Sequence, residues 1–103
     1  MPNRIEHFQT LIAQQPDNEL FHFSLAQALV ADGRASEAIP HYEFCLAKKP
    51  DWMMSRILFG KLLLSLGRTA EARPILEAAL RLAVEQHHET PEAELRAILE
   101  SLR

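Results

Sequence analysis

The chain has 103 residues, of which 48% are hydrophobic and 24% are charged, and its formal net charge at pH 7 is −3. This composition excludes a disordered segment, and the acidic balance offers no basic footprint for nucleic acid. The single cysteine, Cys45, excludes an intramolecular disulfide and fits a reducing compartment. No apolar run reaches the length of a signal-peptide core or a membrane span, so we expect a cytoplasmic protein without a membrane partner.

The most informative feature of the sequence is a repeat with a period of 34 residues. The stretch ADGRASEAIP at residues 31–40 returns as SLGRTAEARP at residues 65–74, and Pro16-Asp17 returns as Pro50-Asp51. A fixed period of this length is typical of stacked helical units. We therefore expect a single domain over residues 1–103, divided into a leading half repeat (1–16), a first repeat (17–50), a second repeat (51–84), and a helix extension with a C-terminal cap (85–103).

The expected elements are all helices. Apolar residues in each unit recur every three to five positions, and no stretch alternates apolar and polar residues over the length of a strand. The chain is therefore predicted to be all-α. The expected helices, in chain order, span residues 3–15, 18–32, 35–48, 52–66, 69–87 and 91–102.

Helix boundaries in the two repeats are predicted from capping residues. Asp17 and Asp51 follow prolines and can accept hydrogen bonds from the amides that open a helix. Gly33 and Gly67 can take the left-handed conformation that ends one helix and turns sharply into the next. Each repeat should therefore fold as two helices joined by a tight glycine turn.

The last part of the chain departs from the repeat. Val84 stands where Pro16 and Pro50 end the earlier units, so the helix before it is expected to run on toward His87-His88. Thr90 and Pro91 are predicted to be the cap and first turn of a closing helix. Its apolar side would carry Leu95, Ile98, Leu99 and Leu102, and its polar side would face water, as the end of a repeat stack requires.

Together these features resemble the tetratricopeptide repeat family. The resemblance covers about residues 4–84 and rests on the 34-residue period, the helix pairs, the turn glycines, the prolines between units, and small residues where helices approach closely, namely Ala26, Ala38, Gly60 and Ala72. It implies a right-handed α-α superhelix of antiparallel helix pairs, about six helices in all, with a C-terminal capping helix.

The resemblance also implies a concave groove lined by the first helix of each repeat. The side chains expected there are Leu20, Phe23, Gln27 and Val30 from the first repeat, and Met54, Ile57, Lys61 and Leu64 from the second. The family's usual task is to hold a peptide or helix of a partner protein, and we expect the apolar groove residues to be exposed for it. The chain is thus predicted to be a protein–protein interaction adaptor or scaffold.

The residues of this groove bear on two further binding modes. Phe23, Gln27 and Leu58 stand where the subclass that clamps the carboxylate tails of heat-shock chaperones has Lys and Asn, so that mode is excluded. The alternative function is self-association, in which a second copy covers the groove or the terminal helix in a homodimer. Trp52, at the start of a helix, suits either an interface anchor or a packing contact at the repeat junction.

Candidate catalytic and metal-binding residues are few. His41 and Cys45 lie four residues apart on one helix face, as metal ligands or a Cys–His pair would, but Cys45 is better interpreted as a small packing residue. His87, His88 and Glu89 are adjacent and point to different faces of a helix end. With no glycine-rich phosphate loop either, we predict no catalytic residues, no metal, no cofactor and no enzyme activity.

Overall fold

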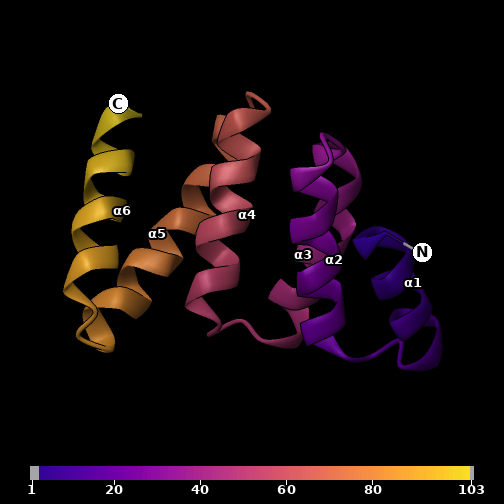
Figure 1. The fold of residues 1–103 in the computed structure, drawn as a ribbon. Helices are drawn as coiled ribbons and strands as arrows, with labels where there is room; N and C mark the ends of the chain where they lie inside the picture. Colours follow the sequence, from indigo (N-terminus) through magenta and orange to yellow (C-terminus); the bar gives the residue numbers. More distant parts are fainter. Residues whose placement is uncertain (1–2, 103) are drawn as a thin grey trace. The chain divides into compact units, whose positions relative to one another are not determined.

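The computed structural model describes residues 3–102, and these residues form six helices and no strand (Figure 1). The helices are α1 (Arg4–Gln14), α2 (Glu19–Ala31), α3 (Ala35–Lys48), α4 (Met53–Ser65), α5 (Thr69–Glu85) and α6 (Glu89–Ser101). The all-α prediction is confirmed, and every boundary lies within two residues of its predicted position. Within residues 3–102 no helix is both long and apolar enough to cross a membrane.

The helices form two compact units, the first ending at Pro50 and the second beginning at Asp51. In the first unit α2 packs against α1 and α3, and in the second α5 packs against α4 and α6. This division between Pro50 and Asp51 coincides with the predicted boundary between the first and the second repeat. The single domain over residues 1–103 stays a prediction, and its ends at residues 1, 2 and 103 lie outside the described residues.

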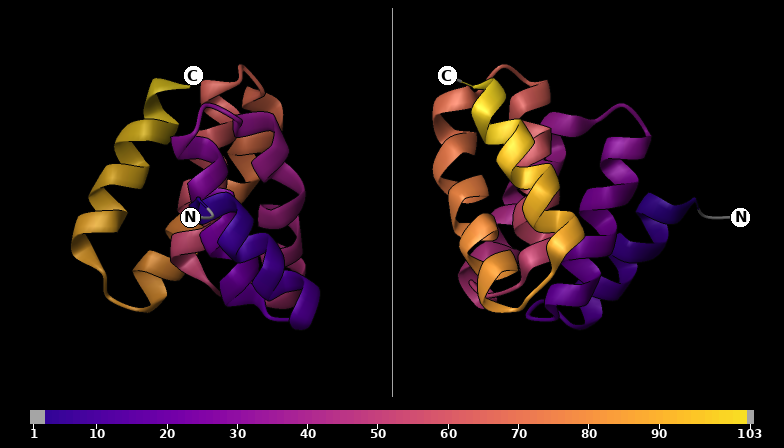
Figure 2. Two further views of the ribbon diagram at one scale, coloured as in Figure 1. Left: turned by 45° about the vertical axis from the view of Figure 1, so that its right-hand side comes forward. Right: turned by 90° about the vertical axis from the view of Figure 1, so that its left-hand side faces the viewer.

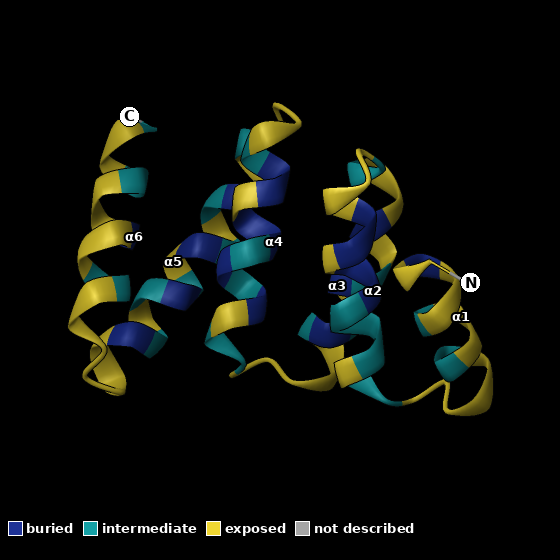
Figure 3. Ribbon diagram, viewed as in Figure 1, coloured by how far each residue is buried: buried dark blue, intermediate teal, exposed yellow. Residues whose placement is uncertain are grey.

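The core of the first unit is built mainly by α2 and α3 (Figure 3). Its buried side chains are Ile5 of α1, Leu25, Ala26, Ala28 and Leu29 of α2, and Ala38, Ile39, Tyr42 and Cys45 of α3. Ala26, Ala38 and Cys45 have no exposed area at all. Small residues at these positions let the two helices approach closely, and the interpretation of Cys45 as a packing residue is confirmed.

The core of the second unit depends on a glycine. A Cβ atom built on Gly60 of α4 would lie 2.5 Å from Cγ of Leu76 in α5, far inside the normal contact distance. Leu76 is fully buried, as is Leu95, which α6 contributes to this core. The closing helix therefore covers the apolar side of α5, and Gly60 is the point of close approach that the sequence predicts.

Three turns of the chain are built alike, although the sequence predicts only two of them. Gly33, Gly67 and His87 all have positive φ, at 77°, 76° and 58°. In each turn the amide of this residue donates to the carbonyl three residues earlier, and the next amide donates to the carbonyl five residues earlier. These are the two hydrogen bonds of a Schellman motif. The α5–α6 turn thus repeats the turn within each helix pair, with a histidine in the place of glycine.

Two predicted caps are wrong by one residue. The N-cap of α2 is Asn18, whose Oδ1 accepts a hydrogen bond from the amide of Leu20 at 3.0 Å, and Asp17 precedes it. The N-cap of α4 is Trp52 rather than Asp51, and it makes no side-chain cap hydrogen bond. Asn is as good a cap as Asp, so the composition of the loop does not decide which of the two residues opens the helix.

The predicted start of the closing helix is also wrong. His88 is the N-cap of α6, so Thr90 and Pro91 lie inside its first turn. The Schellman turn at His87 explains the difference, because it reverses the chain within three residues and lets a helix begin at once. The prediction that α5 runs past Val84 is confirmed, since α5 has 17 residues and ends at Glu85.

Candidate functional site

Four of the predicted binding residues lie on one side of α2. Leu20, Phe23, Gln27 and Val30 are three or four positions apart, which places them on a common helix face; we call this set the α2 face. Leu20 is 58% exposed and Val30 40%, and Gln27 is exposed as well. Phe23 is half-buried, because its ring packs edge-on against Tyr42 of α3 with the ring centroids 6.2 Å apart. The face is apolar and leaves two aliphatic side chains in water.

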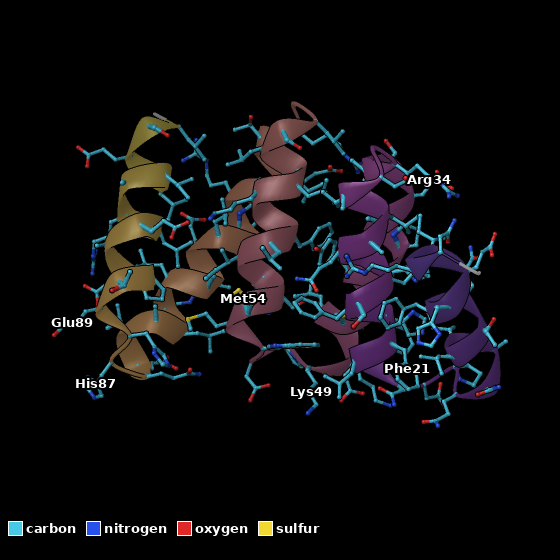
Figure 4. The ribbon with its side chains drawn as sticks, in the orientation of Figure 1. Phe21, Arg34, Lys49, Met54, His87 and Glu89 are labelled. Carbon is cyan, nitrogen blue, oxygen red and sulfur yellow. The ribbon has the colours of Figure 1, made fainter. Side chains whose placement is uncertain are left out.

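The corresponding side of α4 differs from its prediction at one residue. Met54 projects from the first turn of α4 and is 48% exposed (Figure 4). Lys61 is exposed and Leu64 half-buried, but Ile57, which was expected to be exposed, is only 6% exposed. Ile57 belongs to the buried core, whereas Phe23 at the equivalent position of α2 is half-buried. The α4 face therefore consists of Met54, Lys61 and Leu64.

The cation of the α4 face has a partner that the sequence analysis missed. The ammonium of Lys61 forms an ion pair with the carboxylate of Glu94 in α6. Both side chains are nearly half exposed, so the pair contributes little to stability, but it neutralises the charge that Lys61 brings to the face. Glu94 follows Lys61 by 33 residues, and this near match to the period of 34 is the signal that could have suggested the pair.

A polar cluster in the first unit was also missed. His41 Nδ1 lies 3.0 Å from His22 Nδ1, and His22 Nε2 lies 2.7 Å from the carbonyl of Pro16. Because the carbonyl accepts only, His22 donates through Nε2 and accepts from His41 through Nδ1. The ring of Phe44 stacks on His22 with the centroids 4.0 Å apart. Burial and the electrostatic effect of His22 both lower the pKa of His41.

The residues weighed as metal ligands or nucleophiles do not converge. Cys45 Sγ donates to the carbonyl of Glu19, while His41 bonds to His22. His87 and Glu89 project from the exposed α5–α6 turn (Figure 4). Over residues 3–102, no three His, Cys, Asp or Glu side chains come together as a metal site would require. The best-supported candidate surfaces are therefore the α2 face and the α4 face.

Known proteins with related sequences fix the family of this fold. Two models of the tetratricopeptide repeat match the chain, one over residues 29–99 and the other over residues 5–51. The chain belongs to the tetratricopeptide repeat family. No curated protein matches this tetratricopeptide repeat chain.

Two solved structures share the fold. The type III secretion translocator chaperone SycD of Yersinia enterocolitica has 21% sequence identity and a TM-score of 0.87, over 95% of this chain and 68% of its own. The solution structure of protein BPP2914 from Bordetella parapertussis has 27% identity and a TM-score of 0.80, over 99% of this chain and 89% of its own. The tetratricopeptide fold predicted from the repeat is confirmed, and the family is one of protein-interaction modules.

Proposed function

We propose that this tetratricopeptide repeat protein is an adaptor or scaffold that binds a peptide or helix of a partner protein. The observation that carries the proposal is the exposure of Leu20, Val30 and Met54 on the first helices of the two repeats. Exposed large apolar residues on a helix face are costly in water, and where they gather they mark interaction surfaces. The α2 face and the α4 face would each receive apolar side chains of the partner.

The chemistry of the two faces indicates what kind of segment would bind. Gln27 is neutral, and the charge of Lys61 is balanced by Glu94, so neither face selects for a charged ligand. Binding would depend on burial of apolar area, worth about 1.5–3 kcal/mol for each large side chain that becomes fully buried. An amphipathic helix, with apolar residues three and four positions apart, fits this requirement, and its affinity should change little with salt.

The proposal does not involve chemistry on a substrate. We propose a non-enzymatic role without cofactor or metal, in keeping with the family. We also propose a cytoplasmic location, where a free thiol such as that of Cys45 stays reduced. Trp52, half-buried at the start of α4, stays a candidate for either the interface or the repeat junction.

The experiment is affinity capture from the native cell lysate with matched variants. Leu20→Ser with Met54→Ser removes an exposed apolar group from each face, while Leu66→Ser with Val84→Ser makes the same change at exposed residues outside the faces. We expect the first variant to lose the captured protein and the second to retain it, with equal helix content by circular dichroism. Retention by the first variant would contradict the proposal. Ile57 is left unchanged because it is buried.

Sedimentation velocity tests the alternative of self-association. The same exposed residues could be covered by a second copy of the chain, which would give a mass that rises with concentration. If the wild type is a homodimer and the variant Leu20→Ser with Met54→Ser is a monomer, the protein is a self-associating module and not an adaptor. A monomer at all concentrations would remove this alternative.

A further inference from the structure

The second unit contains a polar cleft between α5 and α6, away from the α2 and α4 faces. α6 follows the turn at His87 and packs back against α5 (Figure 2). The cavity between them has a volume of about 470 Å³ and is lined by side chains of both helices. That volume lies in the range of sites that hold a small organic group or a few side chains of a peptide, and is larger than a single ion needs.

Three guanidinium groups line this cleft, and they differ in their hydrogen-bond and ion-pair partners. Arg73 donates to the carbonyl of Leu102 at 2.8 Å, and Arg96 has one contact of 3.3 Å with Glu92. Arg81 is exposed at the cleft, and no acidic side chain of residues 3–102 forms an ion pair with it.

A fourth guanidinium increases the positive charge beside Arg81. Arg56 of α4 has a lowered pKa, first because of its partial burial and second because of repulsion from Arg81. Arg56 is half-buried and Arg81 is exposed, and an anion beside two cations that repel each other stabilises both of them. This local crowding points to a negatively charged ligand.

The remaining lining residues limit which anion would fit. Leu80 and Leu99 are half-buried and add apolar contact surface to the cleft, while Glu77 and Glu100 are exposed on it. The two carboxylates disfavour a compact polyanion such as a phosphate cluster, and the leucines favour a ligand with an apolar group. Carboxylates spaced along a peptide can pair with the arginines of the cleft without lying next to Glu77 or Glu100.

We propose that the α5–α6 cleft binds an acidic segment of a partner protein, in which carboxylate side chains flank an apolar one. The carboxylates pair with Arg81 and Arg96, and the apolar side chain packs against Leu80 and Leu99. Arginine suits this role because its planar fork can hold a carboxylate with two parallel hydrogen bonds. This second surface is chemically distinct from the uncharged α2 and α4 faces and does not depend on them.

The test uses fluorescence anisotropy with a labelled peptide of alternating Glu and Leu. The ionic strength should be about 0.01 M, where the Debye length is about 30 Å. Arg81→Gln with Arg96→Gln alters the cleft, and Arg4→Gln with Lys48→Gln makes the same change in net charge at exposed residues of the first unit. We expect the cleft variant to weaken binding about tenfold or more, because it removes two charge-assisted contacts, and the control variant to leave the affinity unchanged.

Three outcomes would overturn the proposal. They are no binding of the Glu–Leu peptide, equal affinity for the two variants, or equal affinity for a peptide with Gln in place of Glu. Methyl NMR spectra locate the contact: shifts at Leu80 and Leu99 support the cleft, and shifts confined to Leu20 and Met54 contradict it. Leu20→Ser with Met54→Ser should leave the affinity for this peptide unchanged, so the two binding proposals fail or succeed separately.

Discussion

The helix pair α2–α3 and the helix pair α4–α5 have the same turn but different interiors. Each turn carries an arginine paired with a glutamate three residues later, Arg34 with Glu37 and Arg68 with Glu71. Inside the pairs, equivalent positions hold different residues: Ala26 and Tyr42 in the first, Gly60 and Leu76 in the second. The repeated residues thus set the shape of the turn, while the volume between the helices is divided differently in each pair.

The pairs also differ where the first helix begins. The first pair has His22 hydrogen-bonded to His41, and the second has Arg56 and Ile75 at the equivalent positions. Polar contact between helices in one pair is therefore replaced by a charged side chain and an aliphatic one in the other. In this chain the two pairs therefore share their turn but differ in chemistry near their opening end.

The largest expected effect on stability comes from α6, the helix that packs against α5 of the second pair. Leu95 of α6 is fully buried, and Leu95→Ala should lower the free energy of unfolding by about 2–5 kcal/mol through lost burial and a new cavity. Urea unfolding measures the change. The control is Leu20→Ala, where the side chain is 58% exposed and we expect a change within about 0.5 kcal/mol. A loss below that of the control would show that α6 is not part of the core.

The interior difference between the pairs predicts the next largest effect. Gly60→Ala should destabilise the protein by about 1–3 kcal/mol, since the added Cβ would collide with the buried Leu76. At an exposed position in the middle of a helix, Gly→Ala stabilises the helix by about 1 kcal/mol. Thermal unfolding gives the sign, and a raised Tm would contradict the close approach. Leu76→Ala in the same chain should remove the collision, so the two substitutions should not be additive.

The third turn offers a change in the opposite direction. His87 has φ of 58°, which an L side chain adopts only at a cost. His87→Gly should therefore raise the free energy of unfolding by about 1 kcal/mol. The matched change is Gly67→Ala: its Cβ would meet nothing within 4 Å, so the expected loss of about 1 kcal/mol comes from the backbone alone. Guanidinium unfolding measures both, and a loss of stability in His87→Gly would contradict the argument.

The smallest expected effect is a pH dependence that only the first pair should show. The pKa of His41 is lowered in the fold, so the unfolded chain binds more protons and stability falls as pH drops from the unfolded pKa, about 6.5, toward the folded one. His41→Ile copies the residue at the equivalent position, Ile75, and should reduce the fall in Tm between about pH 7 and pH 5.5. If Tm falls equally with pH in the wild type and in His41→Ile, His41 is not the source of the pH dependence.

Much of the fold could be predicted from the sequence, because the repeat fixes it locally. The turns at Gly33 and Gly67 were predicted correctly, since no other residue takes positive φ so easily. The turn at His87 was not, because a histidine carries no such signal. The cap of α2 was misplaced by one residue because Asp17 and Asn18 can both serve, and the cap of α4 was misplaced because Trp52 takes the position without a side-chain hydrogen bond.

The candidate site was less predictable than the fold. Helical spacing placed Leu20, Val30 and Met54 on exposed faces, as the structure has them. Ile57 was misjudged because its exposure depends on how the surrounding side chains cover it, which spacing alone does not give. The pairs Lys61–Glu94 and His22–His41 join different helices, so their geometry depends on helix orientation. The arginine cleft is hidden from the sequence for the same reason.

The arrangement of helix contacts has a consequence for the rate at which the chain folds. The main packing partners are always successive helices, α1 with α2, α2 with α3, α4 with α5, and α5 with α6. Nearly every contact thus forms across a short loop, and a chain of such low contact order pays little loop-closure entropy before its contacts form. The main refolding phase after dilution from urea should therefore take milliseconds or less, and either hairpin can act as the nucleus.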